Sequence, residues 1–424
     1  MFKTVKTTQL HKWHVAQGAN MATFGGYDMP LWYPSGAKQE HLAVLTSAGF
    51  FDTSHMAVVA VSGHHALELL QHCFTRNLNA CVGKNKTPLT VGKCAYGIFL
   101  NEQGTVIDDA IIMQCAPDEY LVVVNAGMGA VIADHLRIHN QQYMATILDM
   151  TDKVGKIDIQ GKQSAHILKQ VLNNPSATLT DMTYFTFKGN FEGDTRETQV
   201  HLINGTPVLL SRTGYTGEFG FEIFMMADQL VAVWELLLDA GKKNGLIACG
   251  LASRDSLRAG AVLPLSHQDI GAWCFANNPW EFALPYNEAK TNFTKRFIGD
   301  DAIENIKTPE YTHAFVGYDL RKVSAHESPA QVLDDNDNPI GIVLSCVSDM
   351  GIGRDNDKIY SIASLDKPVD FTPKGLCCGF VKVRKRLSTG KVVTLKDATR
   401  QIKVVITDDI RPARTARTPM REML

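Results

Sequence analysis

The chain has 424 residues, which is too long for a single hydrophobic core, so we expect roughly two to four domains. Apolar residues make up 45% of the chain, charged residues make up 20%, and the formal net charge is −2. This near-neutral balance is typical of a globular protein and gives no global electrostatic argument for nucleic acid or a membrane surface as a partner. No stretch approaches the roughly 18 apolar residues of a membrane helix.

The cysteines and the N-terminal residues indicate the compartment. Nine cysteines include no CxxC pair, and an odd number without zinc or disulfide spacing indicates reduced thiols. The opening residues, MFKTVKTTQLHKWHV, lack the apolar core of a secretory signal. We therefore expect a cytoplasmic location.

Three segments show the apolar spacing of amphipathic helices. The first, at 35–49, starts at Ser35 as a candidate N-cap and ends at Gly49. The second covers 62–74. The third covers 228–245 and has lysines near its end, where they interact favourably with the helix dipole.

β-branched and aliphatic runs predict strands at 104–113, 119–126 and 206–212. After residue 305 the chain changes to short runs of this kind separated by turn clusters, which indicates a β-rich C-terminal domain. The stretch LDDNDNPIGIV, at 333–343, has the acids of a calcium loop but lacks the glycine and final glutamate of an EF-hand. We expect a hairpin turn there.

The predicted strand GTVIDDAIIM carries two adjacent aspartates in an apolar run. Because side chains alternate between the faces of a strand, Asp108 and Asp109 should point to opposite faces. Asp108 should then lie with Val106, Ala110 and Ile112, and Asp109 with Ile107, Ile111 and Met113. Since both faces are apolar, we expect at least one poorly hydrated carboxylate, which is costly unless it is paired.

The stretch SRTGYTGEFGFEIF, at 211–224, is rich in glycine but is followed by a strand-like run. It lacks the helix N-terminus of a dinucleotide loop, so a glycine-rich hairpin is the better description. Glu222 lies in the outgoing strand. A lone strand carboxylate usually faces solvent; if this one is buried, it needs paired N–H donors, and a pterin presents such a pair.

Other polar residues have a structural and a functional interpretation. Arg254 and Arg258 share one face of a predicted helix, where solvent salt bridges are the usual outcome and clamping of a carboxylate tail is the alternative. His55 is either a catalytic base or, more commonly, a hydrogen-bonded structural residue. His135 and His139 have the spacing of a metal pair, but no acidic or thiol ligand joins them, so we expect no metal site. No P-loop sequence occurs.

Nine segments form a combined pattern across most of residues 10–300. They are GGYDMPLWY (25–33), EHLAVLTSAGFFDTSHM (40–56), NEQGTVIDDAII (101–112), VVVNA (122–126), SRTGYTGEFGFEI (211–223), GLASRDSLR (250–258), LPLSHQDI (263–270), NPWEFAL (278–284) and RFIG (296–299). Together they closely resemble the aminomethyltransferase (T-protein) family of the glycine cleavage system and its folate-dependent relatives. The combination of SHM, IDD and RTGYTGEFGFE is far more specific than any single piece.

The resemblance implies an α+β, three-domain, cloverleaf-like fold around a central channel that holds tetrahydrofolate. The first two domains of this family are interleaved in sequence, and the third is β-rich. We expect a first, folate-binding domain at 1–50 and 150–250, a second at 51–149 and 251–304, and a β-barrel-like domain at 305–424.

The resemblance also implies roles for individual residues. The second aspartate of IDD, Asp109, is the catalytic position, and its apolar neighbours would keep the site dry while Asp108 plays a structural part on the other face. The cofactor-binding positions are Glu222 for the pterin, Tyr215 beside it, Arg254 for the glutamate tail of the folate, and Tyr96 and Asn125 close by. The implied reaction moves a methylene unit from an aminomethyl group on a lipoylated carrier protein to tetrahydrofolate, with release of ammonia.

The chain departs from the family pattern in places. Ala259, Gly260 and Ala261 stand where Leu-Glu-Ala is common, Ser266 and His267 where Tyr-Gly is frequent, and Tyr286 near a common Trp. In the family these positions lie around the channel mouth. The departures leave two alternatives open: a tetrahydrofolate-dependent demethylase of a small methylated metabolite, and a non-catalytic folate-binding protein.

The C-terminal stretch 381–424 contains twelve Lys and Arg against four Asp and Glu. A solvated basic face is the simpler interpretation of such a stretch. The alternative is a docking surface for an acidic partner, and an acidic lipoyl carrier would suit it.

Overall fold

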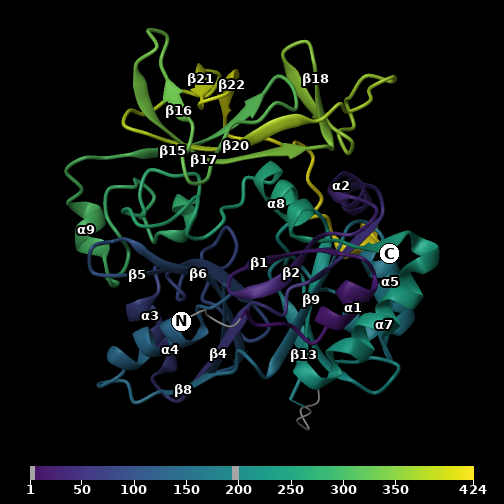
Figure 1. The fold of residues 1–424 in the computed structure, drawn as a ribbon. Coiled ribbons are helices and arrows are strands. Elements are labelled where there is room, and N and C mark those ends of the chain that lie inside the picture. Colours follow the sequence, from purple (N-terminus) through teal and green to yellow (C-terminus); the bar gives the residue numbers. More distant parts are fainter. Residues whose placement is uncertain (1–4, 193–199) are drawn as a thin grey trace.

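The computed structural model describes residues 5–192 and 200–424. In Figure 1 two lobes of helices and strands lie side by side beneath a third lobe that consists mostly of strands. Each lobe has its own sheet and its own buried apolar core. This three-part α+β arrangement confirms the fold class expected from the sequence.

The first lobe is built on a seven-stranded sheet. In spatial order its strands are β10 (Phe187–Gly189), β12 (Pro207–Ser211), β13 (Gly220–Met226), β9 (Val154–Gln160), β3 (Ala48–Asp52) and β14 (Leu246–Ala248), with β11 (Val200–His201) paired to β12. Strand β3 pairs with β9 although the whole sheet of the second lobe lies between them in sequence. The first two lobes are therefore interleaved.

Helices cover this sheet and close its core. They are α1 (His11–Ala16), α2 (Ala37–Thr46), α5 (Ser164–Val171), α6 (Pro175–Leu179) and α7 (Leu230–Gly241). Short 3₁₀ turns extend α7 at both ends, at Ala227–Gln229 and Lys242–Asn244. Helix α7 packs on α5 and β9, and its Trp234 stacks on Phe50 of β3 with ring centroids 4.1 Å apart. Gly245 ends the segment in the left-handed conformation. The helix predicted at 228–245 is confirmed.

The second lobe has a five-stranded antiparallel sheet. Its order is β5 (Cys94–Leu100), β6 (Val106–Ala116), β7 (Glu119–Val124), β4 (Ala57–Ser62) and β8 (Thr146–Asp149), covered by α3 (Ala66–Cys73) and α4 (Gly129–Ile138). The predicted apolar face of α3 is buried, which confirms a helix within 62–74, although Ser62 belongs to β4 and the helix begins at Ala66. A hairpin of β1 (Asn20–Phe24) and β2 (Tyr27–Trp32) completes the N-terminal part.

The third lobe is a closed barrel, so none of its strands has an exposed edge. Around the barrel run β15 (Tyr311–Gly317), β20 (Leu376–Val383), β17 (Pro339–Asp349), β16 (Gln331–Leu333), β21 (Val392–Lys396) and β22 (Gln401–Thr407). The predicted turn at 333–343 joins β16 to β17 as a hairpin. A second hairpin, β18 (Ile352–Asp355) and β19 (Lys358–Ser361), projects from the barrel.

Between the lobes lie α8 (Leu251–Gly260), a 3₁₀ turn (Glu281–Ala283), α9 (Asp300–Glu304) and the loops that join them, and a last 3₁₀ turn (Met420–Glu422) ends the chain. Helix α8 packs on α2 and β2 and also on β17 and β20 of the barrel. Within the described residues, no helix is both long enough and apolar enough to cross a bilayer. We propose the domain limits expected from the sequence, namely 1–50 with 150–250, 51–149 with 251–304, and 305–424. Strand β3 crosses the limit at residue 50.

The helix predicted at 35–49 is also shorter than its sequence pattern. Helix α2 begins after Gly36, which is its N-cap in place of Ser35, and it ends at Thr46. Gly49 lies inside β3. A Cβ at Gly49 would come within 2.4 Å of Val44 and 2.8 Å of the Cys249 sulfur, so glycine is required here by the close approach of α2 and not by a helix end.

Candidate active site

Strand β6 places both aspartates of the IDD motif, and a bulge modifies their arrangement. The register with β5 shifts next to Asp108, so that Ile107 is the extra residue. Ile107 consequently packs against the core that contains Ala110 and Ile112, on the face assigned to Asp108. The expectation that Ile107 shares a face with Asp109 is therefore wrong, because strict alternation does not continue through a bulge.

Asp108 is fully buried and fully hydrogen-bonded. Its Oδ2 accepts the backbone N–H of Asn125 at 2.8 Å, and its Oδ1 accepts Asn125 Nδ2 at 2.8 Å and the hydroxyl of Ser266 at 2.9 Å. These donors satisfy a carboxylate that water cannot reach. The expected poorly hydrated carboxylate is thus present, and it is Asp108.

Asp109 is only partly buried, and neutral donors hold both of its oxygens. Tyr96 donates to Oδ2 at 2.9 Å, and Asn125 Nδ2 donates to Oδ1 at 2.6 Å. Burial and the charge of Asp108 raise the pKa of Asp109 to about 6, against the opposing hydrogen bonds of Tyr96 and Asn125. The same amide nitrogen of Asn125 contacts both aspartates, so Asp108 does not point away from Asp109 as alternation predicts.

Glu222 lies on β13 and is 7% exposed, so the solvent-facing interpretation is wrong. Lys156, on the neighbouring strand β9, donates from Nζ to Oε1 at 2.5 Å. Thr213 donates its hydroxyl to Oε2. A buried carboxylate without partners is costly, and this one has both a cation and a neutral donor.

Arg254, on α8, is also buried and belongs to the same charged cluster. Its Nη1 donates to Asp158 Oδ2 at 2.6 Å, while Lys156 donates to Asp158 Oδ1 at 2.6 Å. Burial would raise the pKa of Asp158, but the two cations outweigh it and hold that pKa below its usual range. A chain of alternating charge therefore runs through Glu222, Lys156, Asp158 and Arg254. The prediction that Arg254 forms a salt bridge in solvent is wrong.

Tyr215 lies between the two clusters. The Arg254 guanidinium stands 5.1 Å from the centre of its ring, and its hydroxyl donates to the carbonyl of Pro264. Burial raises the pKa of Tyr215, and the charge of Asp109 raises it further. All six positions singled out from the sequence therefore belong to two neighbouring groups: Asp109 with Tyr96 and Asn125, and Glu222 and Arg254 with Tyr215 next to them.

Comparison with known proteins identifies the family. The family model described as GCVT N-terminal domain matches residues 10–285. The aminomethyltransferase of Symbiobacterium thermophilum is 34% identical over 76% of this chain and 80% of its own length. That of Staphylococcus epidermidis is 30% identical over 93% of this chain and 98% of its own. The chain belongs to the aminomethyltransferase family.

The fold is also shared with a solved structure. The crystal structure of glycine cleavage system aminomethyltransferase T from Bartonella henselae matches 97% of this chain and 99% of its own length, with a TM-score of 0.74 and 24% identity. This likeness extends through the C-terminal barrel. The expected family, fold and enzyme class, a transferase of one-carbon groups, are confirmed.

Two charged residues of the candidate site in this aminomethyltransferase-family chain were not predicted from the sequence. They are Lys156 and Asp158, which share one face of β9 in the run VGKIDIQ. A signal was present, because charges at alternate positions of an apolar strand indicate one polar face. Ser266 and His267 were expected at the channel mouth, but Ser266 contacts Asp108 directly and His267 Nε2 lies 3.4 Å from its Oδ1.

The remaining candidate residues of this family member are Arg258, His55, His135 and His139. Arg258 is fully buried and pairs with Asp269 and Asp255, so the prediction of a salt bridge in solvent is also wrong for this residue. His55 is buried, burial lowers its pKa to about 4, and its Nδ1 has no hydrogen-bond partner within the described part of the chain. His135 and His139 have ring centroids 5.0 Å apart. No group of three potential metal ligands occurs in 5–192 or 200–424.

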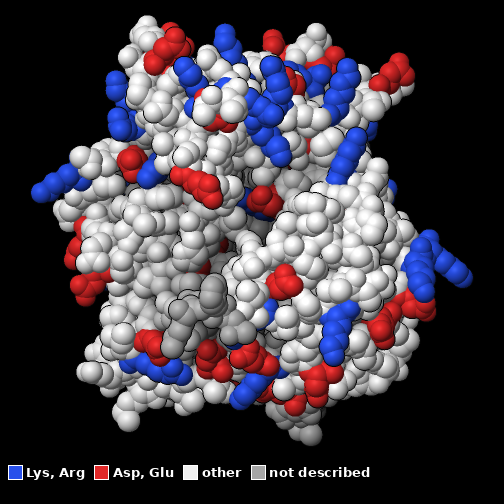
Figure 2. All heavy atoms as spheres, in the orientation of Figure 1, with Lys and Arg blue, Asp and Glu red and all other residues white. Residues whose placement is uncertain are grey.

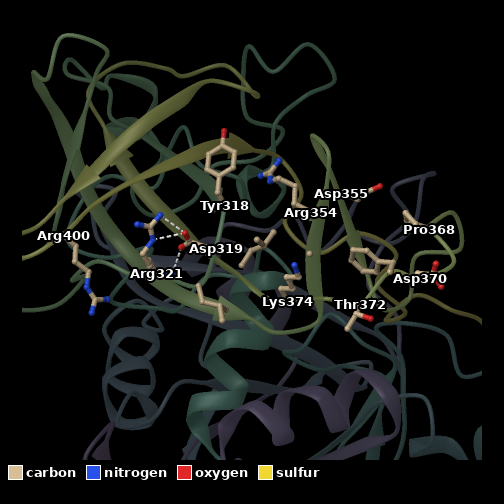
Figure 3. A pocket seen from close by; sticks show the side chains of 15 residues that line it. Tyr318, Asp319, Arg321, Arg354, Asp355, Pro368, Asp370, Thr372, Lys374 and Arg400 are labelled. Atoms are coloured by element: carbon tan, nitrogen blue, oxygen red, sulfur yellow. Dashed lines mark hydrogen bonds and ion pairs between the residues drawn. The ribbon is translucent and has the colours of Figure 1, made fainter.

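The surface is hollowed where the lobes meet, and charged side chains are visible inside the hollow (Figure 2). A separate cavity of about 830 Å³ lies in the C-terminal lobe and is lined by residues that include Tyr318, Arg354 and Lys374 (Figure 3). None of the six predicted site residues lines that cavity. The candidate site is therefore separate from that cavity.

Proposed function

We propose that this chain moves a methylene unit from an aminomethyl-lipoyl carrier protein to tetrahydrofolate and releases ammonia. The observation that carries the proposal is the arrangement of Asp109, a partly exposed carboxylate whose two oxygens are fixed by Tyr96 and Asn125. A carboxylate fixed in advance stabilises developing positive charge without reorganisation, and this effect is large in a poorly hydrated site.

Glu222 suits a pterin. An ionised carboxylate offers about four lone-pair positions. Lys156 and Thr213 occupy one on each oxygen, which leaves one on each oxygen for a pair of parallel N–H donors. Tyr215 would line the same site. Arg254 uses Nη1 for Asp158, and its other donors are the proposed contact for the glutamate tail of the folate.

Tetrahydrofolate, when bound, supplies the nitrogen nucleophile that accepts the one-carbon unit. As the amine departs, positive charge develops on that unit, and the Asp109 carboxylate stabilises it. Tyr96 and Asn125 hold the carboxylate in place throughout. The amine is released as ammonia and the lipoyl sulfur as a thiol, each taking one of the two protons that the acceptor nitrogens lose.

The decisive experiment measures ammonia and methylene-tetrahydrofolate formed from an aminomethylated lipoyl carrier, with folate binding measured in parallel. The wild-type protein should form both products, and Asp109→Asn should form them at least roughly a hundredfold more slowly while it still binds folate. Tight folate binding by the wild-type protein without either product would support the folate site but would exclude the aminomethyl-lipoyl carrier as the donor.

A tetrahydrofolate-dependent demethylase is the second candidate. The observation that favours it is the contact of Ser266 and His267 with the aspartate pair, because these residues replace the common Tyr-Gly of the family. The product separates the two functions: a demethylase forms methyltetrahydrofolate from a methylated metabolite. A folate complex that turns over no donor would instead indicate a non-catalytic binding protein.

The carrier would dock through charge. Lys and Arg side chains gather over the C-terminal lobe in Figure 2, and an acidic carrier is the complementary partner. Added salt should then raise the apparent KM for the carrier while the affinity for free folate changes little. A cytoplasmic location belongs to the same proposal, because no disulfide joins the cysteines of the described residues.

A further inference from the structure

His267 has a backbone conformation that is unusual for its residue type. It follows α8 in the loop where Ser266 and Ile270 form an isolated bridge, and its φ is +64°. L-residues other than glycine are disfavoured there because Cβ crowds the backbone. A side chain that persists in such a conformation is a reason to look for a function of that side chain.

The imidazole of His267 lies against the aspartate pair. Its Nε2 is 3.4 Å from Asp108 Oδ1, the same oxygen that accepts hydrogen bonds from Ser266 and Asn125. Asn125 Nδ2 continues to Asp109 Oδ1 at 2.6 Å. A continuous polar path therefore runs from His267 through Asp108 and Asn125 to Asp109.

The path joins the buried side of the site to its open side. The side chain of Asp108 is completely buried, whereas that of His267 is 49% exposed. The titratable groups that act on His267 are Asp108 and Asp109 of β6. Tyr96 and Tyr215 are the other titratable neighbours of Asp109, and both are neutral phenols because burial raises their pKa.

We propose that His267 is a positioning residue of this site, whose protonated imidazole offsets the charge of buried Asp108 and leaves Asp109 as the free carboxylate that faces the one-carbon unit. The inference rests on the function proposed above. Two carboxylates that share one amide donor repel each other, and a cation on the first relieves this repulsion. Ser266 supports the arrangement by fixing the oxygen that His267 approaches.

The direction of the pKa shifts agrees with this geometry. The hydrogen bond with Asp108 raises the pKa of His267, burial opposes it, and the charges of Asp108 and Asp109 add to the increase. The charge of protonated His267 in turn lowers the pKa of Asp109. Removing the imidazole should therefore leave Asp109 harder to ionise.

The first experiment compares the pH dependence of kcat in the wild-type protein, His267→Gln and His267→Gly. The acid limb should move to higher pH by about half a unit or more in both variants, with little change in folate KM. His267→Gly also removes the disfavoured φ, so its Tm should be unchanged or higher. His65→Gln is the matched control, since His65 is 51% exposed beside Glu68 and away from this site. An unmoved acid limb in both variants would overturn the proposal.

The second experiment needs no turnover. Histidine ring signals in the isotopically labelled full-length protein are titrated by NMR, and His267→Gln assigns the signal. The pKa of His267 should lie above that of an ordinary histidine and should fall in Asp109→Asn. An ordinary pKa that does not respond to Asp109→Asn would refute the role of His267, even in an active enzyme. A coupled His267 in a protein that transfers no one-carbon unit would support the positioning role and would count against the proposed function alone.

Discussion

Lys156 and Glu222 form a buried ion pair across neighbouring strands of the first sheet, with Nζ and Oε1 2.5 Å apart. The pair is the first link of a chain that continues through Asp158 to Arg254. Because positive and negative charges alternate along this chain, no member is buried without an opposite charge. The proposed folate pocket is therefore charged and locally neutral at the same time.

Replacing Glu222 by alanine should weaken folate binding by about 2–4 kcal/mol, because charge-assisted hydrogen bonds in a buried site are lost. The measurement is isothermal titration of tetrahydrofolate into each variant. Glu235→Ala is the control, since Glu235 is an exposed glutamate on α7. Equal affinity of wild type and Glu222→Ala would refute the pterin contact.

The sequence predicted the residues of the site better than it predicted their contacts. The buried carboxylate followed from two aspartates in an apolar strand, and the family pattern supplied Glu222 and Arg254. The bulge at Ile107 could not be predicted, since one extra residue leaves no mark on composition or period. The pairing of Lys156 with Glu222 depends on two strands that are distant in the chain, and so does the contact between His267 and Asp108.

Asp109 should be needed in its ionised form, so turnover should fall as the pH falls through about 6. Below that value we expect kcat to decrease by about tenfold for each pH unit. Asp109→Asn should lower kcat by roughly a hundredfold or more at pH 7.5, as expected when a fixed electrostatic contact to a transition state is lost. Steady-state values of kcat for the wild-type protein and Asp109→Asn between pH 5 and pH 8 test both statements.

The same pKa shift predicts a change in stability with a defined sign. The folded-state pKa of Asp109 is raised, so the folded protein binds a proton that the unfolded chain releases, and the associated stability is lost as the pH rises through about 6. Asp109→Asn cannot ionise and avoids this loss. Relative to wild type, its stability should therefore be about 1–3 kcal/mol more favourable at pH 8 than at pH 4. A difference of the opposite sign between the two pH values would contradict the raised pKa.

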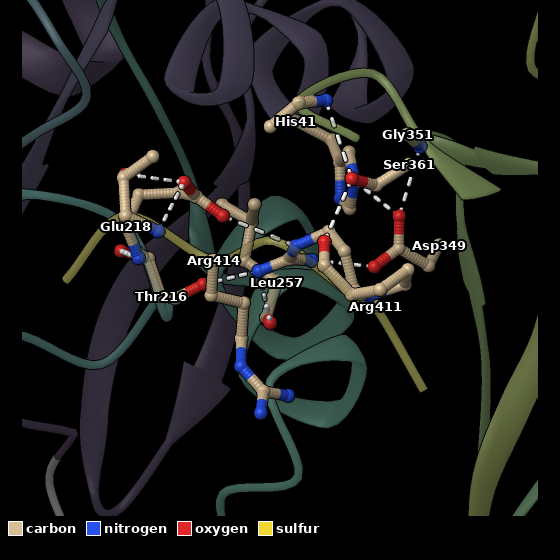
Figure 4. A network of polar contacts seen from close by, with 12 residues as sticks. His41, Thr216, Glu218, Leu257, Asp349, Gly351, Ser361, Arg411 and Arg414 are labelled. Carbon is tan, nitrogen blue, oxygen red and sulfur yellow. Dashed lines mark hydrogen bonds and ion pairs between the residues drawn. The ribbon is translucent and has the colours of Figure 1, made fainter. Parts of the chain in front are cut away.

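Arg411 connects the segment after β22 to the rest of the molecule (Figure 4). It is buried, pairs with Asp349 of β17, and donates to Glu218 of the first lobe at 3.1 Å. Arg411→Met should destabilise the protein by about 3–5 kcal/mol, since it leaves two buried carboxylates without their cation. Arg414→Met removes an ion pair with Asp409 that is largely exposed and should cost less than about 1 kcal/mol. Thermal unfolding of the two variants tests the contrast, and equal losses would contradict it.

Gly260 accounts for one departure from the family pattern. A Cβ at this position would lie 1.9 Å from Asp349 Oδ2 and 2.6 Å from Arg411 Nη1, so a side chain here displaces the buried ion pair. Gly260→Ala should therefore lower stability by about 1–3 kcal/mol, although alanine is the better helix former. In an Asp349→Ala background the nearest obstacle is absent, and the same substitution should cost less. Thermal unfolding of the four proteins of this double-mutant cycle measures the difference. If Gly260→Ala lowered stability equally in both backgrounds, the Asp349–Arg411 ion pair would not be the reason that glycine is required at position 260.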